Sequence, residues 1–101
     1  MTKRFDSFAE FYPFYLGEHA NATCRRLHFA GSSLVLGCVV AALVTGNAWW
    51  LAMTPVAGYG FAWMGHFFFE HNRPATFTYP LYSLLGDWVM WKDMLTGRIR
   101  W

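Results

Sequence analysis

The chain has 101 residues, which is enough for one domain and no more. Hydrophobic residues make up 55% of it and aromatic residues 21%, whereas charged residues make up only 14%, against roughly 25% in an average soluble domain. A net charge of +2 is too small to indicate a nucleic-acid partner, and so apolar and aromatic a composition argues against disorder.

The first predicted element is an amphipathic helix over residues 5–18. Aromatic side chains are interleaved there with Asp6 and Glu10, and a helix with one apolar and one charged face is typical of the membrane interface. A break is expected before Asn21, because a side-chain oxygen at this position can accept a backbone N–H bond and cap the next helix. Thr23 is the other candidate for the cap.

The central part of the chain is uncharged. Residues 27–69 contain no Asp, Glu, Lys or Arg, and these 43 residues are about twice the roughly 20 that one membrane crossing needs. The sequence Thr-Gly-Asn at 45–47 marks a turn in the middle. We therefore predict an all-α fold: an integral membrane helical hairpin with transmembrane helices over 24–45 and 48–70. A soluble bundle is the alternative, but the remaining chain is too short to cover two wholly buried helices.

Two features concern the packing of this hairpin. Small residues let lipid-embedded helices approach closely, and they are expected at the helix contact: Gly31, Gly37 and Ala41 on the first helix, and Ala57, Gly58, Gly60, Ala62 and Gly65 on the second. Pro55 has no backbone N–H, so it is expected to kink the second helix or to begin its regular part.

The C-terminal flank, residues 80–96, is predicted to be a second amphipathic helix, or one partly inserted in the membrane, within a single membrane domain of residues 1–101. Basic residues gather at both ends of the chain and are missing from the connecting turn: Lys3, Arg4, Arg25 and Arg26 precede the hairpin, and Arg73, Lys92, Arg98 and Arg100 follow it. The positive-inside rule therefore places both termini in the cytoplasm.

Histidines from distant parts of the chain are expected to meet at the cytoplasmic end of the hairpin. His28 lies about 18 residues before the central turn and His66 about 20 after it, so at about 1.5 Å per residue they reach the same level within roughly 3 Å. The break before Asn21 lets His19 fold over the helix start toward His28. Ionisable groups at such a depth are costly and mark functional sites.

Two more candidate ligands follow His66. Glu70 is four residues on and shares its helix face, where it can act as a ligand or as a partner that orients His66; a plain interfacial charge is the competing interpretation. His71 is five residues on and lies well round the helix. The sequence Asn-Arg-Pro at 72–74 indicates that the helix ends there, so His71 can turn back toward the site.

Three or four imidazoles with a carboxylate nearby form a nitrogen-rich site that suits Fe, Zn or Cu, and open positions suit O₂ chemistry on Fe(II). The spacing is not specific, since it contains neither HExxH nor a thiolate cluster. Two histidines could instead hold a haem, or the chain could be a non-catalytic subunit of a larger complex. Another lipid-modifying enzyme, such as a hydroxylase, would have HxxHH-like clusters that this sequence lacks. Cys24 is interpreted as a helix-start residue and Cys38 as a small hydrophobe.

Two sequence blocks resemble the 2-hydroxy fatty acid dioxygenases, membrane enzymes that shorten 2-hydroxy acids in phytosphingosine breakdown. The first runs from Phe11-Tyr12-Pro13-Phe14-Tyr15 to His19-Ala20-Asn21 and His28, and the second contains Gly65-His66, Phe69-Glu70 and Arg73-Pro74-Ala75. The family shows a Tyr-rich start, a histidine, an Asn and a second histidine nine residues on. It then shows Gly-His, Phe-Glu and Arg-Pro-Ala at the same offsets. The resemblance covers residues 10–96.

This resemblance implies an Fe(II)-dependent dioxygenase of fatty acid α-oxidation, which removes one carbon from a 2-hydroxy fatty acid with O₂. It carries over His19, His28 and His66 as metal ligands. The longer fungal members have another histidine in extra membrane-spanning sequence, and a lysine where this chain has His71. Either His71 replaces the missing ligand or the site has fewer ligands. Short chains of this layout resemble a bacterial branch, which implies the bacterial inner membrane.

Arginines near the histidine layer suit a substrate carboxylate, because a guanidinium group forms bidentate pairs with it. Arg73 is assigned this role, and Arg73 and Glu70, the latter as ligand or orienting partner, are the two predicted catalytic residues. Arg25 and Arg26 are further candidates, and for each arginine a role as a positive anchor competes. The acyl chain is expected between the hairpin and the flanks, with entry from the bilayer. A homodimer is compatible with so small a domain.

Overall fold

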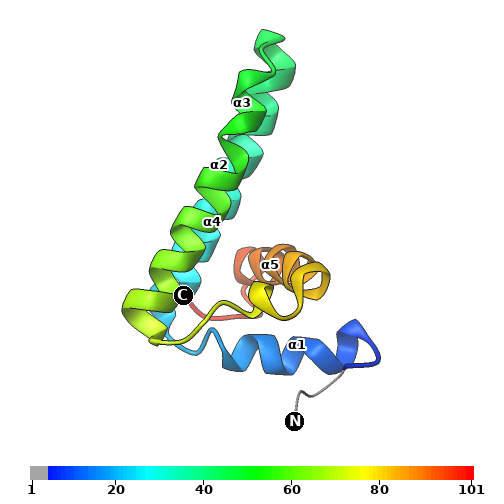
Figure 1. Ribbon diagram of the computed structural model, residues 1–101, viewed down its shortest axis with the longest axis vertical. Coiled ribbons are helices and arrows are strands. Elements are labelled where there is room, and N and C mark those ends of the chain that lie inside the picture. Colours follow the sequence, from blue (N-terminus) through cyan, green and yellow to red (C-terminus); the bar gives the residue numbers. More distant parts are fainter. Residues whose placement is uncertain (1–4) are drawn as a thin grey trace.

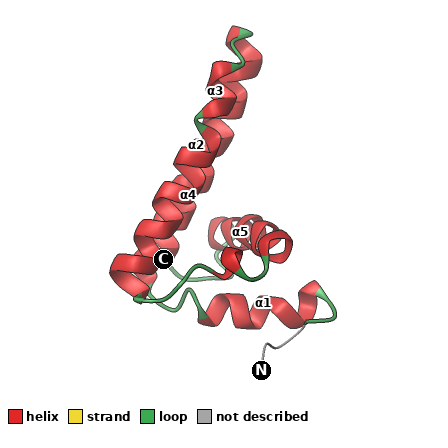
Figure 2. Ribbon diagram, viewed as in Figure 1, coloured by secondary structure: helices red, strands yellow, loops and turns green. Residues whose placement is uncertain are grey.

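The computed structural model describes residues 5–101, and within this range its regular structure is helical, with no strand (Figure 2). In chain order the elements are α1 (Phe8–Gly17), α2 (Ala22–Thr45), α3 (Trp49–Ala52), α4 (Thr54–Gly65), the π-helical turn η1 (His66–Glu70), the 3₁₀ turn η2 (Ala75–Phe77) and α5 (Pro80–Leu95). The all-α prediction is therefore confirmed. Lys3 and Arg4, which contributed to the predicted orientation, lie outside the described residues.

The helices α2, α3 and α4 form one long arm, and α1 and α5 pack beside its lower end (Figure 1). The molecule is accordingly elongated, with extents of 46 × 26 × 25 Å. The arm reverses at the predicted turn. Gly46 ends α2 with a φ of 71°, a left-handed conformation that glycine adopts without strain. The chain then returns along α2, which brings residues far apart in the sequence to one level.

The second half of the arm differs from the predicted transmembrane helix over 48–70. Only α2, among the described residues, is long and apolar enough to cross a membrane by itself, so two spans are not confirmed. Pro55 lies in the first turn of α4, where its missing N–H costs nothing, and α3 ends just before it. At the other end, the chain leaves the α-helical path at His66 and forms a π-helical turn, in which the His71 N–H donates to the His66 carbonyl oxygen.

Glycines allow α2 and α4 to approach closely, as predicted, but only some of the small residues face the partner helix. A Cβ atom on Gly31 would lie 2.9 Å from the Ala57 carbonyl oxygen, and one on Gly65 would lie 2.8 Å from the Cys24 Sγ. By contrast, a Cβ on Gly37 or on Gly60 would meet nothing within 4 Å. The helix contact therefore runs through the Gly31 and Gly65 levels.

We expect Gly31→Val to destabilise the hairpin and Gly37→Val to leave it nearly unchanged. Both changes place the same β-branched residue on α2, but only the first drives a side chain into a backbone carbonyl that cannot rotate away. Overpacking of this kind costs about 1–3 kcal/mol. Thermal unfolding in detergent, followed by circular dichroism, measures the difference. Equal effects of the two substitutions would contradict the close contact.

The main packed core lies at the base of the molecule, between α1, α5 and the segment that precedes α5. Its buried members are Phe5, Phe11, Tyr15, Ala75, Met90 and Met94. A helix thus lies within each predicted flank, α1 within 5–18 and α5 within 80–96; the two helices pack on one another, and α5 also packs on α2. A hydrogen bond of 2.8 Å from the Tyr12 hydroxyl to the Asp93 carboxylate also ties α1 to α5. This base holds the α1–α2 link against the lower end of the hairpin.

Candidate metal centre

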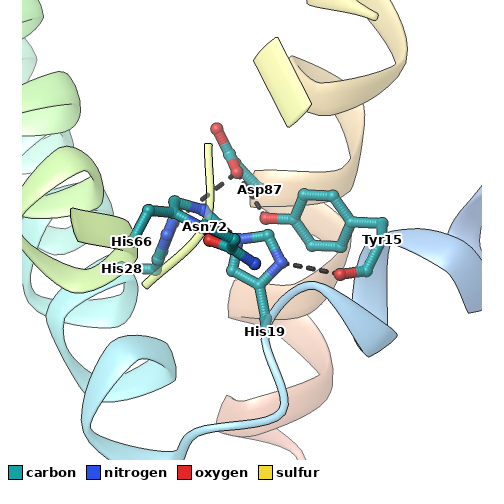
Figure 3. A network of polar contacts seen from close by, with 6 residues as sticks. All are labelled: Tyr15, His19, His28, His66, Asn72 and Asp87. Atoms are coloured by element: carbon teal, nitrogen blue, oxygen red, sulfur yellow. Dashed lines mark hydrogen bonds and ion pairs between the residues drawn. The ribbon is translucent and has the colours of Figure 1, made fainter. Parts of the chain in front are cut away.

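Three histidines from three parts of the chain meet where the base joins the hairpin (Figure 3). His19 comes from the α1–α2 link, His28 from the lower part of α2, and His66 from the start of η1. Their exposed fractions are 1%, 6% and 1%, and their ring centroids lie 4.4 to 5.1 Å apart. The expected meeting of His28 and His66 at one level is observed, and His19 folds over the helix start as the predicted break allows.

The break itself has a clear local cause. The Asn21 side chain accepts hydrogen bonds from the backbone N–H groups of Thr23 and Cys24, so α2 begins with Asn21 as its cap. The Glu70 carboxylate accepts a hydrogen bond from the Asn21 backbone N–H. The turn that carries His66 is thereby tied to the link that carries His19.

Each imidazole has its Nδ1 atom beside an oxygen atom. Nδ1 of His19 lies 2.7 Å from the Tyr15 carbonyl oxygen, and Nδ1 of His66 lies 2.7 Å from the Asn72 side-chain oxygen. For His28 the oxygen belongs to the Asp87 carboxylate, at 3.7 Å from Nδ1. Metal-binding histidines are usually oriented in this way, by a carboxylate or carbonyl oxygen on the nitrogen that does not bind the metal.

These partners fix which nitrogen of His19 and of His66 is protonated. The Tyr15 carbonyl oxygen can only accept, so Nδ1 of His19 donates. The Asn72 side-chain nitrogen donates to the Glu18 carbonyl and carboxylate, which leaves its oxygen to accept from Nδ1 of His66. Both Nε2 atoms therefore present lone pairs, and they face each other at 2.9 Å. Two facing lone pairs repel unless a cation lies beside them.

The third imidazole and a neighbouring cavity agree with this interpretation. Nε2 of His28 is buried and has no hydrogen-bond partner among the described residues. All three histidines line one cavity of about 20 Å³, together with Tyr59 and Asp87, and this is room for about one water-sized particle. Burial and the neighbouring His66 lower the pKa of His19 to about 3, so this ring is neutral at cellular pH and can coordinate. The three imidazoles fit a metal ion.

Cys24 lies with the three histidines, although it was not predicted as a ligand. One potential ligand atom from each of Cys24, His19, His28 and His66 lies within 4.8 Å of the others. Cys24 does lie in the first turn of α2, as interpreted, and it is free and buried. Its position four residues before His28, on the same helix face, was the signal available in the sequence.

We expect the cobalt-loaded protein to show a thiolate-to-cobalt charge-transfer band in the near ultraviolet. Cys24→Ser should remove this band, because serine cannot supply a thiolate to the metal. Cys38→Ser is the matched control, since Cys38 is also free and lies on the same helix well above the histidines. Identical spectra for Cys24→Ser and the parent protein would show that the thiol is only a packing group.

The other sequence-predicted site residues lie outside this group. Glu70 accepts the hydrogen bond from the Asn21 backbone N–H, as described above. His71 ends η1 with a φ of 56° and is exposed. Arg73 is also exposed, and its guanidinium carbon lies 5.5 Å from the centre of the Phe77 ring. The left-handed conformation of His71 reverses the chain and leaves its ring outside the buried cluster.

Arg25 and Arg26 make contacts with main-chain carbonyl groups. Arg25 donates to the carbonyl oxygens of His19 and Ala20, at 3.0 and 2.8 Å, and so braces the link that positions the first histidine. Arg26 donates to the Trp101 carbonyl oxygen at 2.9 Å. Arg25 therefore stabilises the backbone of the link that carries His19.

Asp87 and Tyr15 complete the surroundings of the site, and both were missed as site residues. The Tyr15 hydroxyl donates a hydrogen bond to Asp87, the same carboxylate that faces His28 (Figure 3). Burial raises the pKa of Asp87 to about 6, while the hydrogen bond from Tyr15 opposes that rise. The carboxylate is therefore mostly ionised at neutral pH. No short sequence pattern marks Asp87, and its role becomes visible only where α5 packs on α1 and α2.

The family model described as 2-hydroxy-palmitic acid dioxygenase Mpo1-like matches residues 5–99 of the chain. The matched range contains all three buried histidines, Cys24 and Asp87. Searches of curated proteins and of solved structures gave no match.

Proposed function

The chain belongs to the 2-hydroxy-palmitic acid dioxygenase Mpo1-like family, and from this premise we propose that it is an Fe(II)-dependent membrane dioxygenase. Its reaction would shorten a 2-hydroxy fatty acid by one carbon, through cleavage of the C1–C2 bond with O₂: C2 becomes the new carboxyl group, C1 leaves as CO₂, and one water is formed. One observation carries the proposal: the Nε2 lone pairs of His19 and His66 face each other at 2.9 Å, with the unpartnered Nε2 of His28 buried in the same cluster.

His19, His28 and His66 would hold the iron, with Cys24 as a fourth candidate. When bound, Fe(II) would supply a site for O₂ and for chelation by the carboxylate and hydroxyl groups of the substrate. The protein supplies the orientation of the imidazoles through Tyr15, Asn72 and Asp87, and it supplies burial. Because the three histidines are buried, the site keeps bulk water from the atoms that would bind the metal.

The exposure pattern supports insertion of the hairpin in a membrane. The 24 residues of α2 rise about 36 Å, more than the roughly 30 Å of a hydrocarbon core. Only 17% of its apolar stretch is buried, unlike the core helix of a soluble protein. Near the tip, Leu43 and Val44 are each 79% exposed and Trp49 is 80% exposed. We propose the bacterial inner membrane, with the charged base and both termini in the cytoplasm.

The activity can be tested directly on protein purified in detergent. Iron-loaded protein given 2-hydroxypalmitate and O₂ should release pentadecanoate, and a chelator should stop the reaction. Palmitate is the matched control substrate, because it lacks the hydroxyl group needed for chelation and should remain unchanged. Folded, iron-loaded protein that yields no shortened acid would refute the proposed activity.

The geometry disfavours a bis-histidine haem site. Two axial imidazoles must approach an iron from opposite faces of a porphyrin, whereas Nε2 of His19 and of His66 nearly touch. The cavity that the three histidines help to line measures about 20 Å³, which has no room for a macrocycle. A purified protein with a haem absorption spectrum would reverse this conclusion.

A further inference from the structure

A second, larger cavity adjoins the histidine cluster. It has a volume of about 220 Å³ and lies between α2, α4 and α5. His28, Tyr59 and Asp87 line both this cavity and the small one that the three histidines help to line. A molecule in the larger cavity is therefore separated from the metal centre by shared side chains only.

The lining of this cavity changes from polar to apolar along the hairpin. His28 and Asp87 stand at the end near the metal centre with Ser32 beyond them, and Val35, Pro55 and Leu84 contribute apolar walls. Thr54 also lines the far end, but its hydroxyl donates to the Leu51 carbonyl oxygen. From His28 to Val35 the helix rises by about 10 Å. An occupant that matches this lining has a polar head at the histidines and an apolar chain directed toward the tip of the hairpin.

We propose that this cavity seats the first carbons of the acyl chain of the 2-hydroxy acid, and that Gly58 sets its width. This inference rests on the proposed function. Cavities that enclose most of a drug-sized ligand measure roughly 300–1,000 Å³, so 220 Å³ accommodates only part of a long chain. The rest of the chain lies along the exposed apolar faces of the hairpin. The cavity therefore contacts the carbons near the head group, so binding depends on these carbons and not on the total length of the acyl chain.

Gly58 is the position at which the cavity is most easily narrowed. It lines the cavity from α4, and a Cβ atom there would lie 3.4 Å from a methyl group of Val35, at ordinary contact distance. A small side chain is thus accommodated, whereas a branched one takes space from the ligand. Gly60 is two residues on in the same helix, and a Cβ there would meet nothing within 4 Å. The pair offers a matched comparison.

The test is photolabelling with a 2-hydroxy fatty acid that carries a diazirine on its fifth carbon. Labelled peptides from the metal-loaded protein are mapped by mass spectrometry, and excess 2-hydroxypalmitate serves as competitor. We expect label on the stretches that contain Ser32, Gly58 and Trp88, which line the cavity from its three helices. Gly58→Leu should lower this labelling by about tenfold, the loss expected when roughly two methylene groups no longer fit. Gly60→Leu should label like the parent protein.

Metal content and folding are measured in parallel, so that a misfolded variant is recognised. Labelling of the parent protein alone also tests the proposal, because label spread evenly over the outer face of the hairpin would overturn it. Equal labelling of Gly58→Leu and Gly60→Leu would overturn it as well. Labelling needs no turnover. Label in the cavity without any shortened product would contradict the dioxygenase activity and support the acyl site. Shortened product with label outside the cavity would support the activity and contradict the acyl site.

Discussion

His28→Ala should yield folded protein whose metal affinity is lowered about a hundredfold and whose shortening of 2-hydroxy acids falls with the loss of metal. Its Nε2 is one of three imidazole nitrogens turned into the buried cluster, and alanine leaves no donor atom in its place. Structural zinc sites release about 10–16 kcal/mol on metal binding. One of three or four ligands therefore carries about 3 kcal/mol, which is on the order of a hundredfold in affinity.

His71 provides the matched control, because it is an exposed histidine just beyond the same helix end. Its φ of 56° suits asparagine better than alanine, so His71→Asn is the appropriate substitution. Elemental analysis after dialysis against a competing chelator should find metal in the parent protein and in His71→Asn and much less in His28→Ala, with similar circular dichroism for all three. Equal metal content in His28→Ala and the parent protein, or a loss of metal in His71→Asn, would assign the ligands differently.

The level at which the histidines meet could be predicted because it depends on few quantities. The rise of a helix is constant, and Gly46 marks the reversal, so His28 and His66 had to lie at similar heights. The small residues of the hairpin show the limit of this reasoning. Gly31 and Gly37 are equally small, yet only Gly31 faces α4. Which side of a helix meets its partner depends on rotation about the axis, and composition does not determine that rotation.

The role of Asp87 and the outward position of His71 could not be predicted, because they depend on tertiary packing and on the local backbone conformation. Asp87 lies near His28 because α5 packs on α2 as well as on α1, and no short-range pattern encodes that contact. His71 was assigned as a ligand on the expectation that the helix end turns it inward, but the left-handed residue that ends η1 is His71 itself, and its ring is exposed. Cys24 could have been predicted from its spacing, because it lies four residues before His28 on the same helix face. The sequence has no cluster of cysteines, so a thiolate ligand was not expected.

Asp87→Asn should weaken metal binding by about 10- to 100-fold, the usual effect of removing a carboxylate that orients a metal-binding histidine. The carboxylate lies 3.7 Å from Nδ1 of His28 and accepts the Tyr15 hydroxyl. Asparagine has nearly the same shape but no charge, so the pull on the imidazole N–H is lost while most packing contacts are kept. Competition against a chelating metal indicator measures the affinity.

Asp93→Asn distinguishes this role from simple stabilisation of the base. Asp93 lies on the same helix and accepts a 2.8 Å hydrogen bond from Tyr12, so it makes a second tyrosine–carboxylate tie between α1 and α5. Its other charged neighbour is Lys92, at 3.5 Å. Both substitutions therefore loosen α1 from α5, but only the change at Asp87 alters a group that faces a histidine. Similar losses of thermal stability with a loss of metal affinity in Asp87→Asn alone would establish the positioning role. Equal affinities in the two variants would reduce Asp87 to a packing residue, and would leave His28 oriented by its burial alone.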